Sequence, residues 1–206
     1  MDGNTRGMAS ASATDFPWIK ICGITNREDA ELAISLGASA IGLIFAPSVR
    51  EVPVERAREL VRQVRGRVEV VGVFKEIRSV RAIHEAVGLD RAQIHVPGDP
   101  GVHLPILRAL RPQGLQHAAN VPANEWILID GSEGRGLTFD WTLATTLSRS
   151  FVLAGGLNPE NVKEACRVAR PKGVDVTSGV ELAPGRKDPD KVARFISAVK
   201  SLPRPA

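Results

Sequence analysis

The chain has 206 residues, a length typical of one domain, and 43% of them are hydrophobic while 24% are charged. A chain of this size can bury roughly 70% of its unfolded surface, so one sizeable core is expected and a disordered or fibrous protein is excluded. The formal net charge of +4 fits an anionic partner, either a phosphorylated metabolite or a nucleic acid. Because basic residues are scattered among acidic ones, with no basic stripe interleaved with aromatic residues, we expect a small phosphorylated substrate and no nucleic acid.

Cysteine usage and the N-terminal segment favour a cytoplasmic protein. Cys22 and Cys166 lie far apart without a CxxC spacing, so neither a disulfide framework nor a zinc site is indicated. Residues 1–15 are small and polar, with no apolar signal-peptide core, and the apolar stretch 40–47 is too short to cross a bilayer. We therefore expect no membrane contact, a disordered extension at 1–15 that is native or added by cloning, and one domain at 16–206.

Short β-branched runs alternate with amphipathic or turn-rich stretches about every 20 to 30 residues, which is the repeat of a parallel α/β protein. Eight parallel strands in a chain of this length predict a single (β/α)8 TIM barrel, although a compact doubly wound sheet fits the same periodicity. The eight candidates are Trp18–Ile24, Ala40–Phe45, Val68–Phe74, Ala92–Val96, Gly114–Ala119, Trp126–Asp130, Phe151–Ala154 and Gly173–Thr177.

Helix signals separate the candidate strands. Thr25 to Glu28 has the form of a capping box, and Gly37 would end that helix. The second helix can begin at Pro53, and a later one at Asn158-Pro159, a cap followed by proline. Only residues 120–125, which include a proline, separate the fifth and sixth candidate strands. The fifth outer helix is therefore expected to be missing or replaced by a loop.

Functional groups of such a barrel gather at the carboxyl ends of its strands. In the first strand, Lys20 and Cys22 share the face opposite Ile19 and Ile21, because side chains alternate along a strand. If the isoleucines pack against helices, Cys22 points into the barrel mouth. A lone cysteine in a strand is most often a small buried apolar residue, but its position at the strand end, before Gly23, favours a functional thiol. Lys20 is then either an ion-pair partner inside the barrel or an electrostatic aid to a thiolate.

Asp130 ends the sixth candidate strand on the same face as Trp126 and Leu128. An aspartate at a strand end is commonly a turn former or a helix cap. Here the next helix begins only near Asp140, which is the better candidate for its cap. Asp130 is therefore a second candidate for acid or base chemistry at the barrel mouth.

Glycine pairs follow the last two strands. Gly155-Gly156 and Ser178-Gly179 would let backbone N–H groups approach an anion at the two loops where barrels often bind phosphate, although glycine also simply makes turns. Gly136, in the loop after the sixth strand, either wraps the same substrate or belongs to a flexible solvent loop. Arg50 follows the second strand, and its guanidinium suits a carboxylate, although most surface arginines are merely solvated.

The motifs resemble, in chain order, those of the phosphoribosylanthranilate isomerase family. The chain departs from the family pattern after the fourth candidate strand, where Gln93-Ile94-His95 is followed by Val96-Pro97, and again around the fifth. The resemblance covers about Trp18 to Leu202 and rests on residues 20–25, 28–30, 42–45, 48–50, 71–74, 128–130, 136–141, 154–162 and 174–181.

The resemblance implies an Amadori rearrangement of N-(5'-phosphoribosyl)anthranilate to 1-(2-carboxyphenylamino)-1-deoxyribulose 5-phosphate, a step of tryptophan biosynthesis that needs no cofactor or metal. It implies that Asp130 is the general acid that opens the sugar ring and that Cys22 is the general base that removes the C2 proton. It also implies that Arg50 meets the substrate carboxylate and that the loops after strands seven and eight hold the phosphate. A monomer and a homodimer both remain open.

Two alternatives remain. One is the related barrel isomerase of histidine biosynthesis, a family with an aspartate at the position of Cys22. The other is a non-catalytic sugar-phosphate-binding barrel, which would have a broken acid/base pair, whereas Cys22 and Asp130 are both present.

Overall fold

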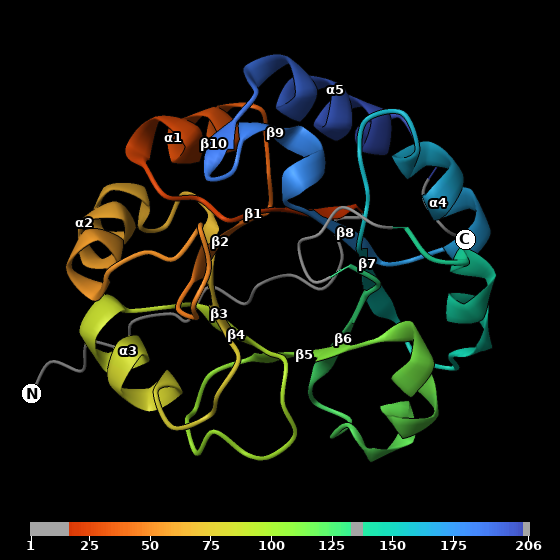
Figure 1. Cartoon of the computed structure of the whole chain (residues 1–206), viewed down its shortest axis with the longest axis horizontal. Helices are drawn as coiled ribbons and strands as arrows, with labels where there is room; N and C mark the ends of the chain where they lie inside the picture. Colours follow the sequence, from red (N-terminus) through yellow and green to blue (C-terminus); the bar gives the residue numbers. More distant parts are fainter. Residues whose placement is uncertain (1–16, 133–137, 204–206) are drawn as a thin grey trace, which may run out of the picture.

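The computed structural model describes residues 17–132 and 138–203 and contains a closed barrel of eight parallel strands in sequential order, as Figure 1 shows. Strand β8 pairs with β1 and closes the barrel, which confirms the TIM barrel and excludes an open, doubly wound sheet. The extension expected at 1–15 lies outside the described residues. The strands are β1 (Trp18–Cys22), β2 (Ala40–Ile44), β3 (Glu69–Phe74), β4 (Arg91–Ile94), β5 (Ile106–Leu110), β6 (Trp126–Asp130), β7 (Phe151–Ala154) and β8 (Gly173–Val176).

Five α-helices surround the barrel in the described part of the chain (Figure 1). Their buried residues and the outward side chains of the strands form one large apolar cluster, in which Ile19 and Ile21 of β1 are fully buried. Burial of these aliphatic side chains between two layers is the main stabilising term of such a fold. The helices are α1 (Arg27–Ser35), α2 (Val54–Val64), α3 (Val80–Val87), α4 (Val162–Ala169) and α5 (Pro189–Lys200).

The fifth strand was placed too late by the sequence analysis. Residues 114–119 lie in the 3-10 helix η1 (Pro112–Asn120), and β5 precedes it at Ile106–Leu110. No α-helix joins β5 to β6, as expected, but the connection is η1 rather than a loop. A loop, not a helix, also joins β4 to β5, so the strands there follow one another more closely than the repeat predicted.

Two helix starts also differ from the expected ones. The N-cap of α1 is Asn26, whose side chain accepts a hydrogen bond of 2.8 Å from Asp29 N. Thr25 Oγ1 instead donates to the carbonyl of Gly185 at 2.7 Å, so the expected capping box does not form. Asn158 caps a turn, and α4 begins only at Val162. Both shifts are local, because asparagine is a strong cap wherever its side chain reaches a free backbone donor.

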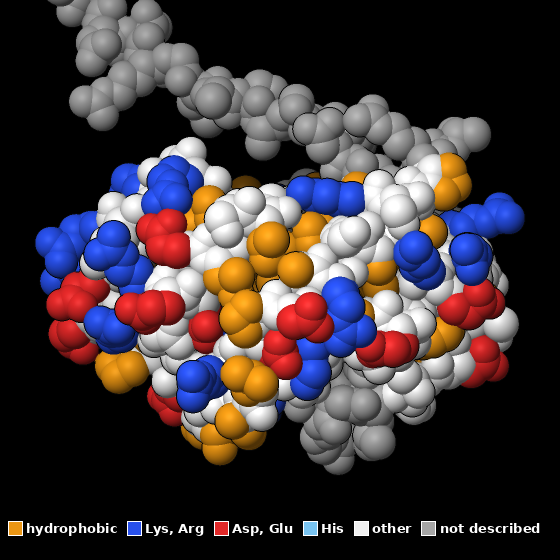
Figure 2. All heavy atoms as spheres, turned by 90° about the horizontal axis from the view of Figure 1, so that it is seen from above, with side chains coloured by type: hydrophobic (Ala, Val, Ile, Leu, Met, Phe, Trp, Pro, Cys, Tyr) orange, Lys and Arg blue, Asp and Glu red, His pale blue; other side chains and the backbone are white. Residues whose placement is uncertain are grey.

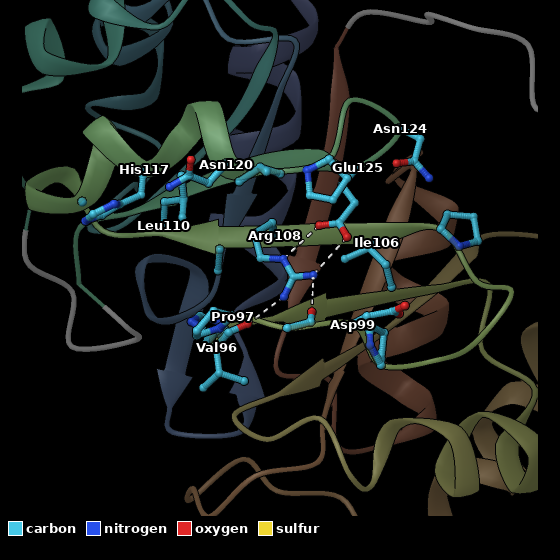
Figure 3. Close-up of a pocket in the computed structure, with 18 of the residues that line it drawn as sticks. Val96, Pro97, Asp99, Ile106, Arg108, Leu110, His117, Asn120, Asn124 and Glu125 are labelled. Atoms are coloured by element: carbon cyan, nitrogen blue, oxygen red, sulfur yellow. Dashed lines mark hydrogen bonds and ion pairs between the residues drawn. The ribbon is translucent and has the colours of Figure 1, made fainter.

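A groove of about 1330 Å³ runs along the outer face of β5, where a helix between β4 and β5 would otherwise pack. Arg108 crosses its floor, as Figure 3 shows. The guanidinium forms an ion pair with Glu125 at 2.9 Å and donates to the carbonyls of Val96 and Gly98. Arg108 therefore ties the β4–β5 loop to the segment that leads into β6.

A short antiparallel hairpin that the sequence analysis did not foresee follows β8. It consists of the 3-10 helix η3 (Ser178–Val180), β9 (Glu181–Ala183) and β10 (Arg186–Lys187). In Figure 1 the hairpin lies beside α1. Asp29 of α1 accepts a hydrogen bond of 2.9 Å from the backbone of Lys187, which fixes the hairpin to the start of that helix.

The surface over α1 and α5 carries acidic and basic side chains side by side, with apolar side chains between them, as Figure 2 shows. Surface ion pairs such as Arg67 with Glu31 and Arg194 with Glu160 join opposite charges at 2.7 and 2.6 Å. The net positive charge is thus not concentrated on this face. In the two described ranges, no helix is both long and apolar enough to cross a membrane.

Candidate active site

Cys22 is the last residue of β1 and faces the barrel interior together with Lys20. Its side chain is buried, and it is paired in register with Gly42 on β2. A Cβ at position 42 would lie 2.6 Å from Cys22 Sγ and 3.0 Å from Lys20 Nζ, so the thiol and the ammonium group occupy neighbouring space above Gly42. The prediction that Ile19 and Ile21 pack outward while Cys22 faces the interior is confirmed.

Lys20 is fully buried and forms an ion pair with a residue of the neighbouring strand β8. Its Nζ lies 2.9 Å from Asp175 Oδ1 on β8 and donates to Gln93 Oε1 on β4 at 3.0 Å. Burial on its own would lower the pKa of Lys20, but Asp175 and the Cys22 thiol raise it above the ordinary lysine value. Because a lysine can only donate, Gln93 turns its amide nitrogen toward His95, whose Nε2 is 2.9 Å away.

The Cys22 thiol is buried beside Lys20, whose positive charge is paired with the Asp175 carboxylate. Burial raises the pKa of Cys22, while Lys20 and, more weakly, Lys187 oppose that shift. Asp175 acts in the same direction as burial. In the free protein Cys22 is therefore a thiol at neutral pH. Of the two roles considered for Lys20, the structure shows the ion pair with Asp175, while its effect on a Cys22 thiolate stays a prediction.

Asp130 is the last residue of β6 and reaches the same end of the barrel. Its Oδ1 accepts a hydrogen bond of 2.9 Å from Ser132 N, so the carboxyl group also shapes the turn that follows the strand. A small cavity is lined by Asp130, Asp175 and the glycine pair 155–156, together with other residues of the last two loops. Asp140 caps the 3-10 helix η2 (Trp141–Thr146), as expected.

The loops after β7 and β8 line this cavity with backbone groups. Gly155 and Gly156 have φ values of +92° and +65°, a conformation that L residues with side chains rarely adopt. Ser178, the first residue of η3, lines the same cavity. Gly179 lies where the two loops touch, and a Cβ there would come 3.1 Å from Asn158 Cα. Gly136 lies outside the described residues.

Arg50 is held by a carboxylate of the protein itself. Its Nε lies 2.9 and 3.1 Å from the two carboxylate oxygens of Glu181, and its Nη2 lies 2.7 Å from Oε2. Lys187 Nζ is 2.9 Å from Glu181 Oε1. Burial alone would raise the pKa of Glu181, but Arg50 and Lys187 hold it below its ordinary value. Burial lowers the pKa of Lys187, and Glu181 opposes that shift.

The structure thus brings Cys22, Asp130 and the two glycine-containing loops after β7 and β8 to one end of the barrel. Sequence reasoning missed four buried polar residues that surround them: Gln93, Asp175, Glu181 and Lys187. A signal existed for the first two, because each interrupts an apolar strand on its inward side, and buried polar groups must be paired. Within the described ranges, no three His, Cys, Asp or Glu side chains are grouped as a metal ion would require.

Comparison with known proteins agrees with this geometry over nearly the whole domain. A family model described as N-(5'phosphoribosyl)anthranilate (PRA) isomerase matches residues 19–198. The N-(5'-phosphoribosyl)anthranilate isomerase of Acidithiobacillus ferrooxidans is 40% identical over 198 residues, which span 88% of this chain and 97% of that protein. The one from Streptococcus pneumoniae strain Taiwan19F-14 is 42% identical over 191 residues, 88% of this chain and 95% of that protein.

A solved structure points the same way. The crystal structure of phosphoribosyl anthranilate isomerase from Thermotoga maritima superposes with a TM-score of 0.82 at 36% identity, covering 90% of this chain and 100% of that one. The residues matched by the family model and the sequence identity to these relatives show more than a shared fold. The chain therefore belongs to the N-(5'-phosphoribosyl)anthranilate isomerase family.

Proposed function

We propose that this chain isomerises N-(5'-phosphoribosyl)anthranilate to 1-(2-carboxyphenylamino)-1-deoxyribulose 5-phosphate in tryptophan biosynthesis, with Asp130 as general acid and Cys22 as general base. The observation that carries the proposal is the placement of these two residues, each at the carboxyl end of its strand and on the inner side of one closed barrel. Strands β1 and β6 are separated by β7 and β8, so a ribose can lie between the two side chains.

The first step opens the furanose ring. The Asp130 carboxyl group gives its proton to the ring oxygen, the bond between that oxygen and C1 breaks, and the anthranilate nitrogen donates its lone pair to form a C1=N Schiff base. Ser132 N donates a hydrogen bond of 2.9 Å to Asp130 Oδ1, which orients the carboxyl group at the end of β6.

The second step forms the ketone. The Cys22 thiolate removes the proton from C2, the electron pair of that C–H bond forms C1=C2, and the Schiff-base electrons return to nitrogen. Tautomerisation then moves a proton from the C2 hydroxyl to C1 and leaves the ketone. Each turnover transfers one proton from Asp130 to Cys22, so the pair returns to its starting state when that proton passes back.

The protonation state of the free protein explains why the acid and the base must be considered together. With Cys22 protonated, the reactive arrangement requires that the thiol loses its proton while Asp130 holds one. The protonated iminium of the opened substrate then favours the nearby thiolate by charge attraction.

Binding groups lie on either side of this pair. The backbone N–H groups at Gly155, Gly156, Ser178 and Gly179 are proposed to hold the phosphate, as glycine-rich loops of barrels do. Gly136 is proposed to contact the same substrate. Arg50 is proposed to bind the anthranilate carboxylate. The protein is proposed to act in the cytoplasm as a monomer or homodimer, without binding nucleic acid.

A fluorescence assay tests the proposal. Purified protein should consume phosphoribosylanthranilate generated in situ, measured as loss of anthranilate fluorescence. Cys22→Ala and Asp130→Asn should each reduce kcat by at least about 10²-fold while circular dichroism stays unchanged. Cys166→Ala is the matched control, since burial raises the pKa of this α4 thiol to about 12 and it lies away from the mouth.

Three outcomes would overturn the proposal or one of its residue roles. Near-normal turnover by Cys22→Ala or Asp130→Asn would remove that residue from its role. A wild-type protein that binds the sugar phosphate without turnover would instead support a non-catalytic barrel, and turnover of only the aminoimidazole substrate of histidine biosynthesis would support the related isomerase. The presence of Cys22, rather than an aspartate, favours the tryptophan-pathway substrate.

A further inference from the structure

Glu181 connects two cations that no step of the proposed reaction uses directly. Its side chain is 4% exposed and contacts Arg50 in bidentate fashion while Lys187 Nζ approaches Oε1 to 2.9 Å. The backbone N of Gly185 adds a contact of 3.3 Å to Oε1. A buried carboxylate with this many donors is firmly oriented, and so are the two cations bound to it.

The bond pattern leaves one edge of the Arg50 guanidinium for a second carboxylate. A guanidinium carries five N–H donors, and Glu181 takes the edge formed by Nε and Nη2. Among the hydrogen bonds of the described residues, none involves Nη1 of Arg50. One donor of Nη1 and the second donor of Nη2 therefore form an end-on fork that matches a carboxylate.

The Arg50 side chain also lies next to the proposed catalytic thiol. Its Cδ is 2.8 Å from the position that a Cβ at Gly23 would take, and Gly23 directly follows Cys22. Proximity to Cys22 adds to the contact with Glu181 in raising the pKa of Arg50. A carboxylate on the free fork of Arg50 would thus lie beside the reacting sugar, as the anthranilate ring of the proposed substrate requires.

Charge balance assigns a role to Lys187. An Arg50–Glu181 pair alone has no net charge, and the Glu181 carboxylate would repel a second carboxylate brought to the same guanidinium. Lys187 is 2% exposed, is held through its backbone by Asp29 at 2.9 Å, and brings the cluster to a net charge of +1 from two cations and one anion. Effects of this kind are strong because the cluster is largely shielded from water.

We propose that Glu181 and Lys187 are positioning residues that make the site specific for a carboxylated aryl substrate: Glu181 fixes the free fork of Arg50, and Lys187 offsets the charge of Glu181. The inference rests on the proposed function and deepens it, since it names how this site distinguishes anthranilate from an aniline without a carboxylate. Neither residue touches the reacting atoms.

The test compares two ligands that differ only in the carboxylate. The first is reduced 1-(o-carboxyphenylamino)-1-deoxyribulose 5-phosphate, and the second is its counterpart made from aniline. Calorimetry should show that Glu181→Gln and Lys187→Met weaken binding of the first ligand by about tenfold or more and leave binding of the second within about threefold. In turnover of phosphoribosylanthranilate, KM should rise in the same proportion while kcat changes little.

Two controls make the result specific. Lys187→Arg keeps the positive charge and should retain most of the preference for the carboxylated ligand. If Lys187 mattered only through its shape, Lys187→Arg would lose this preference as Lys187→Met does. Glu160→Gln removes an exposed carboxylate whose partner is Arg194, and it should match the wild type. If Glu181→Gln does not fold, the pair Lys187→Met and Lys187→Arg still decides the question.

The outcomes separate this inference from the proposed function. If folded Lys187→Met loses affinity for both ligands equally, or keeps its affinity for both, the proposed role of Glu181 and Lys187 is wrong. The isomerase proposal is unaffected by that result as long as the wild-type protein turns over phosphoribosylanthranilate. A wild-type protein that neither turns over phosphoribosylanthranilate nor binds the reduced product would overturn both.

Discussion

Gly42 on β2 lies opposite Cys22 on β1, and a Cβ at position 42 would come within 2.6 Å of the Cys22 sulfur. The same Cβ would approach Lys20 Cε to 2.9 Å. Both distances are shorter than side chains tolerate, and the barrel wall gives the buried Lys20 no open space to move into. The absence of a side chain at position 42 is therefore what allows the thiol and the ammonium group to sit together.

Gly42→Ala should accordingly displace Cys22 and Lys20 without removing either. We expect kcat to fall at least tenfold, because small misplacements of a catalytic group are costly, and the free energy of unfolding to fall by about 1–3 kcal/mol through overpacking. Turnover measured by fluorescence and urea denaturation check the two expectations. Gly114→Ala is the control, since a Cβ there would meet only His117 Cδ2 at 4.0 Å, and it should be close to neutral. Wild-type kcat in Gly42→Ala would show that the thiol tolerates displacement.

The barrel and the inward placement of Cys22 and Asp130 at its strand ends were predictable because they depend on local pattern. Alternation along β1 and β6 places Cys22 and Asp130 inward whatever the neighbouring strands do. The glycine pairs after β7 and β8 were likewise identified by their position in the chain.

The fifth strand was not predictable from spacing, because the repeat itself fails there. Only a loop separates β4 from β5, and Arg108 in the middle of β5 interrupts its apolar pattern. Arg108 is nonetheless 6% exposed, because Glu125 and two carbonyls of the β4–β5 loop satisfy its donors. Such pairing depends on residues brought together only by the fold.

The same reason explains why the Glu181 cluster escaped notice. Arg50 and Glu181 are separated by 131 positions in sequence, and the hairpin that carries Glu181 and Lys187 has no strong strand pattern of its own. Arg50 could be recognised as a carboxylate ligand by its chemistry. The Glu181 carboxylate that orients Arg50 can be recognised only in the three-dimensional structure.

Arg108→Met should destabilise the domain without touching the mouth. The change would leave the Glu125 carboxylate, about 10% exposed, without its cation. It would also remove the donors to the carbonyl of Gly98 and to that of Val96, which lies on the other side of the groove in Figure 3. Loss of one partner of a buried ion pair typically costs about 3–5 kcal/mol. Urea denaturation at pH 7 measures this loss.

A control and a double variant make the Arg108 result interpretable. Arg194→Met removes an arginine that is half exposed and pairs at the surface, so the change in unfolding free energy should stay below about 1 kcal/mol. Arg108→Met combined with Glu125→Leu should recover part of the loss, since no unpaired charge remains. An equally small effect of Arg108→Met and Arg194→Met would show that the Arg108 bridge contributes little to the fold.

Lys172 directly precedes β8 and lies at the opposite end of the barrel, beside the residues that begin β4 and β6. Its Nζ is 2.9 Å from the centroid of the Trp126 ring, and Arg91 lies 4.3 Å from the same ring. Burial, followed by repulsion from Arg91 and Arg149, lowers the pKa of Lys172 to about 7. The charge of Glu69 opposes this shift but is the smaller contribution.

This lowered pKa gives the stability of the protein a pH dependence whose sign can be worked out. Below pH 7 both folded and unfolded chains bind the Lys172 proton, so the full cost of burying the charge is present. Between pH of about 7 and about 10.5 only the unfolded chain binds it, so stability rises with pH in that window. Because the amine is only half-buried and solvent screens it, we expect a gain of about 1 kcal/mol or less.

Lys172→Met should be more stable than the wild type at pH 6 and should lose this rise in urea denaturation between pH 7 and 9. Lys163→Met, at an exposed position of α4, should keep the rise, and a wild-type slope in Lys172→Met would mean that another group causes it.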